Sequence, residues 1–250
     1  MSVKVFFSTW RPRDGTERFA AVSHPMTLCF YRVTAMQSYR ARFPSSVRYA
    51  KDVLLHNLAG GKLLRSRLVN ATAGAFQSGQ CVDTTPLRTA VELVHAGFLM
   101  ADDCCDKARH RRGEPTWWTK VGVSNAWNDA NMLCFLSKAV LRDAYHEHEA
   151  SWFLQQTFDE ATLRTIVGQH HDMSVMQDHA MSTYQRVAWL KTGYYTFWLP
   201  IISATAVAAP RQDIVRNINR DVELLGNLLA EMYQSQNDMQ GVADGDPSDE

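Results

Sequence analysis

The sequence predicts an all-α fold, a single domain built as a bundle of mostly antiparallel helices. Two observations lead to this prediction: apolar residues recur at helical spacing in segment after segment, and no stretch alternates apolar and polar residues between hairpin turns. The chain has 250 residues, of which 46% are hydrophobic, and this is enough to fill one sizeable core. Packing helices on helices is the simplest way to bury such apolar faces.

The helices are expected in a clear order along the chain. The first, 47–58, ends at Gly60 and Gly61, because glycine favours helix ends. The second, 86–106, begins with Pro86, and its second half is nearly all apolar, which predicts a helix buried on most sides. Four further helical segments follow: 124–148, 160–176, 192–209 and 213–239.

Charge and cysteine content argue against several classes of protein. The 26 basic residues balance the 26 acidic ones, so a nucleic-acid partner is not indicated, and no apolar run reaches the length of a transmembrane helix. The five cysteines show no paired spacing, which favours a reducing, cytoplasmic environment. Residues 1–25 are basic and rich in turn-forming residues. They are either a variable extension or a mitochondrial transit peptide, and the helical domain is expected to span 26–250.

The segment FLMADDCCDKARHRRGEPTWW ends an apolar run with three aspartates and two arginines: Asp102, Asp103, Asp106, Arg111 and Arg112. On a helix, Asp102 and Asp106 share one face, whereas Asp103 points about 100° away. Two such carboxylates, completed by water or phosphate oxygens, suit Mg2+, and the arginines offer forked donors to phosphate. The alternative is that the arginines simply form ion pairs with the aspartates.

Several motifs, taken together, resemble the trans-isoprenyl diphosphate synthase family, specifically the farnesyl diphosphate synthase type. The family's first aspartate-rich region has the pattern DDxxD followed by RRG and Pro, as in the segment above. Further similar motifs follow the family's order: HNLAGGKLLR, GQHHDM, LKTGYYTFWLPI and YQSQNDMQGVADGDP. The resemblance covers about residues 45–247. It implies an isoprenoid synthase helix bundle around a central cavity, Mg2+ as cofactor, and a homodimer.

The resemblance also implies roles for individual residues. Catalytic roles fall on Asp102, Asp106, Lys191 and Thr192. Substrate binding falls on Lys62, Arg65, His95, Arg111, Arg112 and Gln169. Metal binding falls on Asp102, Asp103, Asp106, Asp172, Asn237 and Asp238. The implied reaction is the condensation of isopentenyl diphosphate with an allylic diphosphate, with the positive charges and Mg2+ stabilising the departing diphosphate.

Each diphosphate has its own set of expected ligands. By the resemblance, Lys62, Arg65 and Arg112 bind isopentenyl diphosphate, and His95 helps from a position where this type often has glutamine. Arg111 binds the allylic diphosphate. The plainer alternative is that Gly60 and Gly61 only end a helix and the neighbouring charges are solvated, and that Gln169 and Asp172 belong to an ordinary polar helix face.

Two residues that precede the aspartates are expected to set product length. Gly97 and Phe98 lie five and four positions before Asp102, about one helical turn away, where farnesyl-type enzymes commonly carry two phenylalanines. We expect Phe98 to close the pocket floor. The alternative is that Gly97, which has no side chain, opens a channel past Phe98 and permits a longer product.

The second metal motif departs from the family pattern. It begins with Asn237 and Asp238 and has Gly241 where a third carboxylate is usual, so a third metal ion should bind more weakly. An Asn-Asp start also resembles terpene synthases, including insect terpene synthases derived from farnesyl diphosphate synthases. Family members continue well beyond this motif, whereas the chain ends at Glu250, so C-terminal helices are expected to be missing. A terpene synthase and a catalytically silent partner subunit therefore remain as alternatives.

Overall fold

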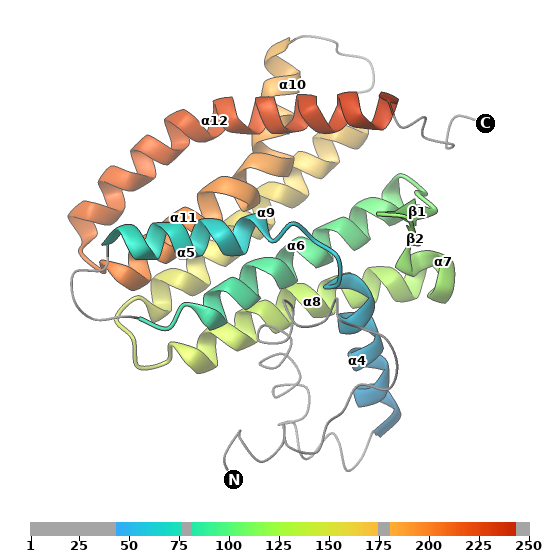
Figure 1. Cartoon of the computed structure of the whole chain (residues 1–250), viewed down its shortest axis with the longest axis horizontal. Helices are drawn as coiled ribbons and strands as arrows, with labels where there is room; N and C mark the ends of the chain where they lie inside the picture. Colours follow the sequence, from blue (N-terminus) through green and yellow to red (C-terminus); the bar gives the residue numbers. More distant parts are fainter. Residues whose placement is uncertain (1–43, 77–81, 175–180, 244–250) are drawn as a thin grey trace.

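The computed structural model describes residues 44–76, 82–174 and 181–243, and these form a helical bundle (Figure 1). The helices are α4 (Pro44–Asn57), α5 (Leu64–Phe76), α6 (Thr85–Cys105), α7 (Trp117–Val121), α8 (Val123–Ala144), α9 (Ser151–Ser174), α10 (Met181–Val187), the π-helix η2 (Ala188–Trp198), α11 (Leu199–Ala208) and α12 (Gln212–Ala243). Two short strands, β1 (His110–Arg111) and β2 (Glu114–Pro115), complete the described elements. The prediction of an all-α fold is confirmed. The predicted basic extension, 1–25, lies outside the described residues.

Helix α6 is the centre of the bundle and belongs to two hydrophobic clusters. Its Leu87 and Val91 pack into a cluster shared with α5, α9, η2 and α11. Its Leu93 and Met100 face the opposite way, into a cluster shared with α4, α7 and α8. The prediction that this nearly all-apolar helix is buried on most sides is therefore confirmed, and the burial fixes the position of the aspartates at its C-terminal end.

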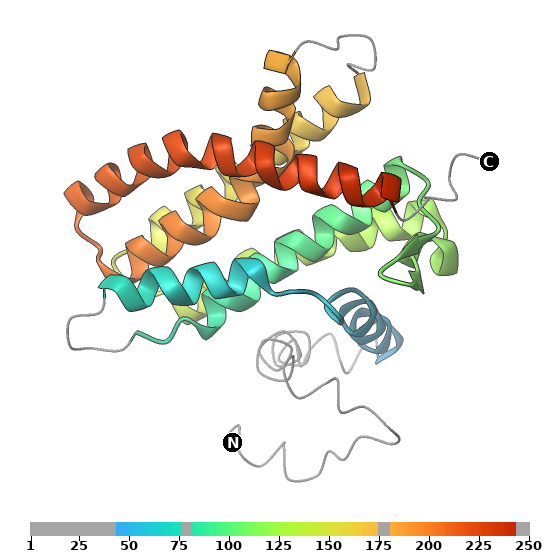
Figure 2. The same cartoon turned by 45° about the horizontal axis from the view of Figure 1, so that its top comes forward.

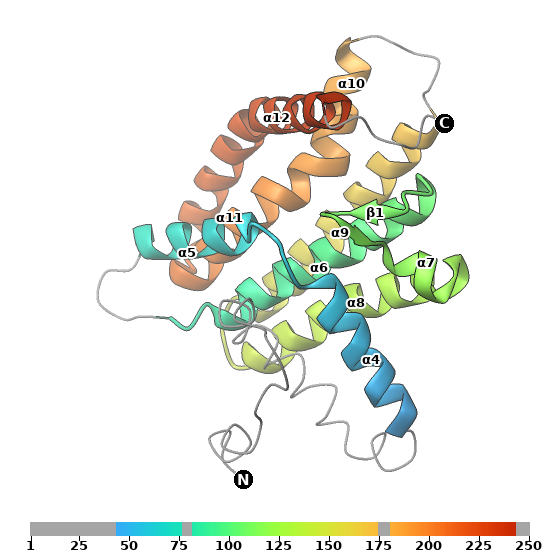
Figure 3. The same ribbon diagram turned by 45° about the vertical axis from the view of Figure 1, so that its right-hand side comes forward.

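Helices α12 and α4 lie on opposite sides of this centre. Figure 2 shows α12 crossing above η2 and α11, and Figure 3 shows α4 below α6 and α8. Two clefts flank α12, one of about 370 Å³ beside α9 and one of about 410 Å³ beside α5 and α11, and none of the predicted aspartates lines either cleft. The outer face of α12 exposes Leu224, Leu228 and Met232.

The segment predicted as a helix over 192–209 is helical, but its first part is a π-helix. In η2 the ring of Trp189 lies against two glycines, because a Cβ at Gly226 of α12 would be 2.5 Å from its Cζ3 and a Cβ at Gly193 would be 3.0 Å from the same atom. π-Helical turns are rare and concentrate at functional sites. Here the wide turn carries Lys191 and Thr192.

Helices α5, α7 and α10 and the β1–β2 hairpin were not predicted from the sequence. Helix α5 contains Ser66, Asn70 and Gly74, which weaken its helical pattern, yet it packs closely on α6 and α11. The β1–β2 hairpin turns on Arg112 and Gly113, both with positive φ (57° and 79°), which is the combination of a type I′ turn. Strands of two residues are too short to show alternation, so the pattern could not reveal them.

None of the helices among the described residues is both long enough and apolar enough to cross a membrane.

Candidate active site at the C-terminal end of α6

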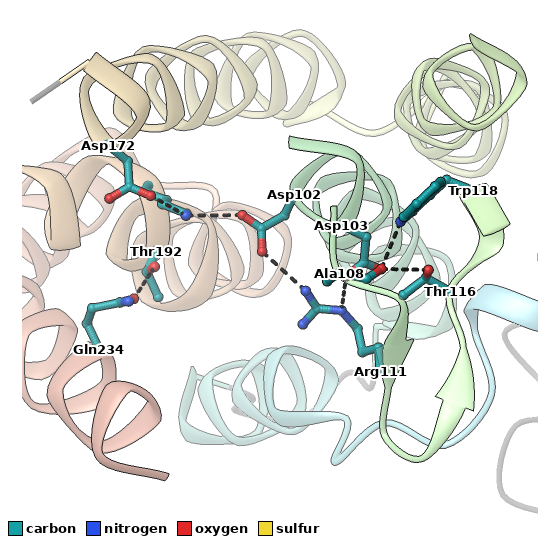
Figure 4. Close-up of polar contacts among 10 residues, drawn as sticks. Asp102, Asp103, Ala108, Arg111, Thr116, Trp118, Asp172, Thr192 and Gln234 are labelled. Carbon is teal, nitrogen blue, oxygen red and sulfur yellow. Dashed lines mark hydrogen bonds and ion pairs between the residues drawn. The ribbon is translucent and has the colours of Figure 1, made fainter. Parts of the chain in front are cut away.

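The three aspartates of the first motif divide between two directions, as the helical spacing predicts. Asp102 and Asp103 lie in the last turn of α6, and Asp106 caps its C-terminal end. Arg111, on β1, binds two of these carboxylates. Its Nε donates to Asp103 Oδ1 at 2.7 Å, and its Nη2 donates to Asp102 Oδ2 at 3.2 Å. Figure 4 shows Asp102 between Arg111 and Asp172. The ion-pair alternative for this arginine therefore describes part of the site.

The hairpin that carries Arg111 is anchored by hydrogen bonds to the loop before it. The carbonyl of Ala108 accepts from Trp118 Nε1 at 2.8 Å and from Thr116 Oγ1 at 2.7 Å (Figure 4). Thr116 also donates its backbone N–H to the carbonyl of Arg109 at 2.9 Å. These bonds satisfy backbone groups that the short strands leave unpaired, so the guanidinium is held in place over the aspartates.

Lys191 joins α6 to α9. Its Nζ lies 3.0 Å from Asp102 Oδ1 and 2.6 Å from Asp172 Oδ2, although these carboxylates are 70 residues apart in sequence. Burial disfavours the charged ammonium, but the two carboxylates outweigh it and raise the pKa of Lys191. The side chain is therefore a firmly protonated cation at the centre of the aspartates.

Ionisation of two further carboxylates, Asp103 and Asp106, is disfavoured by their surroundings. Burial and then the charge of Asp102 raise the pKa of Asp106, and Asp172 adds to the effect. Burial raises the pKa of Asp103 to about 6, against the opposing influence of Arg111. Like charges gathered in a partly buried place are unfavourable unless further cations neutralise them. The cluster is thus suited to attract cations.

The donor set fits magnesium bound through few carboxylates. Within the described part of the chain, no group of three histidine, cysteine or acidic side chains is placed to hold one ion. Mg2+, however, is usually held by one or two carboxylates together with substrate phosphates. The oxygen donors near Lys191 belong to Asp102, Asp106 and Asp172. Asp103 is buried, and its Oδ1 accepts a hydrogen bond from Arg111. The side chains of Asn237 and Asp238, at the end of α12, lie outside the described residues.

A second group of cations, Arg65 and Arg112, lies near Arg111. Arg65, on α5, is 4% exposed, and its Nη2 donates to Thr196 Oγ1 at 2.6 Å. Arg112 donates to the carbonyl of Ala59 at 3.4 Å, and a Cβ at Gly61 would lie 3.3 Å from its Nη1. The glycine pair therefore does more than end α4, because a larger residue at 61 would crowd this guanidinium.

Lys62 stands at the entrance to α5 and is exposed. The next residue, Leu63, has φ of +51°, a conformation that non-glycine residues rarely adopt. Lys107 and Arg112 adopt it as well, each with φ of +57°. Unusual backbone conformations of this kind concentrate at functional sites, where surrounding contacts maintain them.

Tyr195 of η2 connects the arginine group to the apolar wall. The Arg65 guanidinium carbon lies 4.6 Å from its ring centroid, and the His95 ring stacks on it at 5.8 Å. Phe98 meets the same ring edge-on at 5.1 Å. Phe98 therefore lies on the face of α6 that points toward η2, where it packs against the core.

Gly97 faces the other way. A Cβ at this position would lie 2.9 Å from Ala130 O and 2.9 Å from Cys134 Sγ, both on α8. The missing side chain thus permits close packing of α6 on α8, and it does not open a channel beside Phe98. The packing speaks against the alternative that Gly97 opens a channel, and the expectation that Phe98 closes the pocket floor stays a prediction. Helical spacing alone did not tell which neighbour each face meets.

Three polar residues complete the surroundings. Thr192 is buried and donates from its Oγ1 to Gln234 Oε1 of α12 at 2.9 Å (Figure 4). Gln169, on α9, has a buried Nε2 without a hydrogen-bond partner among the described residues. Sequence reasoning did not select Thr196 or Gln234. Their only signal was that they lie within two of the motifs quoted above, Thr196 in LKTGYYTFWLPI and Gln234 in YQSQNDMQGVADGDP.

Comparisons with known proteins agree with this geometry. The polyprenyl synthetase family pattern matches residues 47–249. The chain belongs to the polyprenyl synthetase family. Farnesyl pyrophosphate synthases of Candida albicans and Saccharomyces cerevisiae are each 29% identical over 201 residues, covering 74% of this chain and 56% of theirs. The chain thus spans a little over half the length of these relatives.

The fold of this polyprenyl synthetase family member is also found in solved structures. Trypanosoma brucei farnesyl diphosphate synthase complexed with minodronate superposes with a TM-score of 0.76 at 22% identity, covering 85% of this chain and 67% of the other. A further structure of the T. brucei enzyme gives a TM-score of 0.74 at 24% identity. At this identity the likeness concerns the fold, and it confirms the predicted isoprenoid synthase bundle.

Proposed function

We propose that this chain carries the active site of a Mg2+-dependent prenyltransferase that condenses isopentenyl diphosphate with an allylic diphosphate. One observation supports this most strongly: two separate charged groups lie near Arg111. One group contains Asp102 and Lys191, and the other contains Arg65 and Arg112. A site that takes two diphosphates needs two such groups, whereas ionising one diphosphate needs only the first.

Some of these residues would bind Mg2+ and the diphosphates, and others would exclude water from the reacting carbons. Bound Mg2+, held by Asp102, Asp106 and Asp172, would supply positive charge against the allylic diphosphate. Lys191 and Arg111 offer donors to the same diphosphate, so negative charge that develops on it is stabilised. Lys62, Arg65, Arg112 and His95 orient isopentenyl diphosphate, while Phe98 and Tyr195 exclude water from the reacting carbons. Thr192 and Gln169 complete the polar rim.

A terpene synthase is the second candidate. It is favoured by Asn237 and Gly241, because a weaker second metal motif departs from the prenyltransferase pattern. Against it stand Arg65 and Arg112, which an enzyme that uses one diphosphate does not require. A catalytically silent partner subunit is the third candidate, and it predicts no turnover of any diphosphate.

One assay separates these candidates. The protein is incubated with Mg2+ and geranyl or farnesyl diphosphate, with and without isopentenyl diphosphate, and both diphosphate products and released hydrocarbons are analysed. Elongated diphosphates formed only with isopentenyl diphosphate are the expected result. Hydrocarbons or alcohols formed without it would make the chain a terpene synthase, and no product under either condition would favour the silent subunit.

We also propose a homodimer through α9 and α8. Trp152, Leu163 and Ile166 are 73%, 59% and 57% exposed, and their spacing places them on one face of α9. Phe135, on the neighbouring helix α8, is 69% exposed. An apolar stripe of this kind favours a second copy of the same surface. Sedimentation velocity should show a dimer that Leu163→Asp converts to a monomer, with Leu224→Asp on α12 as the matched control.

The compartment stays a prediction, cytoplasmic or, through residues 1–25, mitochondrial. Imaging of the chain fused at its C-terminus to a fluorescent protein, with and without residues 1–25, distinguishes the two.

A further inference from the structure

The second charged group contains a histidine with an unusual set of neighbours. Nε2 of His95 lies 3.3 Å from Nη1 of Arg65, which is always a donor, so Nε2 must accept. The proton of the neutral ring is then on Nδ1, which is buried and has no hydrogen-bond partner among the described residues. Nε2 of the imidazole thus accepts a hydrogen bond from Arg65, and its Nδ1–H remains a donor without a partner among the described residues.

The charged side chains that face this ring are all arginines, and they come from two elements of the structure. Arg65 approaches from α5, and Arg111 and Arg112 approach from the β1–β2 hairpin. From η2 comes the uncharged ring of Tyr195, which stacks on the imidazole. On α6 itself Glu92 lies three positions before His95, and its Oε1 accepts from the backbone N–H of Ser66 at the start of α5. Burial first, and then the three arginines, lower the pKa of His95 well below its usual range.

We propose that His95 is a proton-linked ligand of the diphosphate group: it is neutral in the free protein and takes up one proton from solvent when a diphosphate binds between Arg65 and Arg112. The inference rests on the proposed function, since it deepens the role of the isopentenyl diphosphate subsite. The proton is added at Nε2, and a diphosphate oxygen replaces the arginine as the partner of that nitrogen. Nδ1–H stays in place throughout.

The physical reason is that a bound diphosphate changes the charge around the imidazole from positive toward negative. Three arginines around an empty site oppose an imidazolium, but a diphosphate brings at least two negative charges into the same space. An opposite charge within about 4–6 Å favours the charged form by roughly one to three pKa units. A glutamine amide at this position would offer a donor and an acceptor but no titration. As the pH falls, the affinity of the wild-type chain for diphosphate should therefore rise relative to that of His95→Gln, by up to roughly tenfold per pH unit.

Calorimetric titration with inorganic pyrophosphate tests this, in Mg2+-free buffer at pH 6, 7 and 8. Two buffers of different ionisation enthalpy give the number of protons taken up on binding. The wild-type chain should take up more protons than His95→Gln, by up to one, at the lower pH values. Titration of the ligand itself is the same for both proteins and cancels in the difference. His110→Gln, which removes an exposed histidine beside Arg111, should behave as the wild type.

Equal proton uptake by wild type and His95→Gln would overturn the inference. A second measurement needs no variant: the NMR titration of the His95 Cε1 proton should move to higher pH when pyrophosphate is added, and an unmoved titration would also overturn it. Failure of the proposed function is distinguishable, because it appears in the product assay. Proton uptake without turnover leaves the linkage standing, and turnover with equal uptake removes the linkage alone.

Discussion

Gly168 of α9 lies directly against the backbone of Lys191. A Cβ at Gly168 would be 2.7 Å from the Lys191 Cα and 2.6 Å from the carbonyl carbon of Leu190, distances that real Cβ atoms do not show. The π-helix can therefore approach α9 this closely only because residue 168 has no side chain. This contact sets how far the Lys191 ammonium reaches toward Asp102 and Asp172.

Gly168→Ala should push η2 away from α9. We expect a loss of about 1–3 kcal/mol in the free energy of unfolding, because backbone atoms cannot yield as a flexible side chain can. Turnover should fall further than stability explains, since Lys191 is displaced. Urea denaturation and kcat measured in parallel check this. Gly74→Ala on α5 is the matched control: nothing lies within 4 Å of its Cβ, so stability should be unchanged or slightly higher.

Asp102→Asn should reduce turnover by about a hundredfold or more, because the change removes a metal ligand and one partner of Lys191. Asp106→Asn should have a similar effect. The measurement is product formation at saturating Mg2+ and substrate. Asp159→Asn, which alters an ion pair with Lys138 elsewhere on the surface, is the control and should retain activity. Full activity in Asp102→Asn would remove the metal assignment.

Lys62→Ala and Arg65→Ala should raise the KM for isopentenyl diphosphate by about tenfold or more, the effect of losing a charge-assisted hydrogen bond, and should leave binding of the allylic diphosphate nearly unchanged. Steady-state kinetics with each substrate varied in turn give both constants. Arg65→Ala also removes contacts to Thr196 and Tyr195, so its thermal stability is recorded alongside. Turnover that needs no isopentenyl diphosphate and ignores both changes would favour the terpene synthase.

Phe98→Ala should lengthen the product, because its ring fills the space beside Tyr195. Mass spectrometry of dephosphorylated products gives the chain length. Gly97→Ala provides the contrast: it should leave product length unchanged and cost about 1–3 kcal/mol of stability, since its Cβ would press on α8. Unaltered chain length in Phe98→Ala would place the pocket floor elsewhere.

The free energy of unfolding should decrease at acid pH because of His95. Its pKa is lowered in the folded state, so below about pH 6.5 the unfolded chain binds a proton that the folded chain does not. The free energy of unfolding then decreases as the pH falls, by at most roughly 1.4 kcal/mol per pH unit for one proton. Urea denaturation from pH 7.5 to 5 should show a shallower slope for His95→Gln than for the wild type. The same slope in both would mean that His95 titrates normally.

Much of the molecule was determined by the sequence alone. The spacing of apolar residues predicted the long helices, because a helix in a bundle must show a continuous apolar face. The split between Asp102 and Asp103 followed from the helical repeat, and the structure has Asp102 toward Lys191 and Asp103 toward Arg111. These features depend on residues close in sequence, and a local pattern is enough to reveal them.

Other features were decided only by the tertiary structure. The repeat of α6 says that Gly97 and Phe98 point in different directions, but only packing determines that one meets α8 and the other Tyr195. Likewise, the bond from Arg65 to His95 joins residues 30 positions apart, and Lys191 reaches Asp102 across the bundle. Periodicity specifies which face of a helix is apolar, whereas the partner of that face depends on how all the helices fit together. The proton-linked role of His95 and the close approach at Gly168 both arise from that fit.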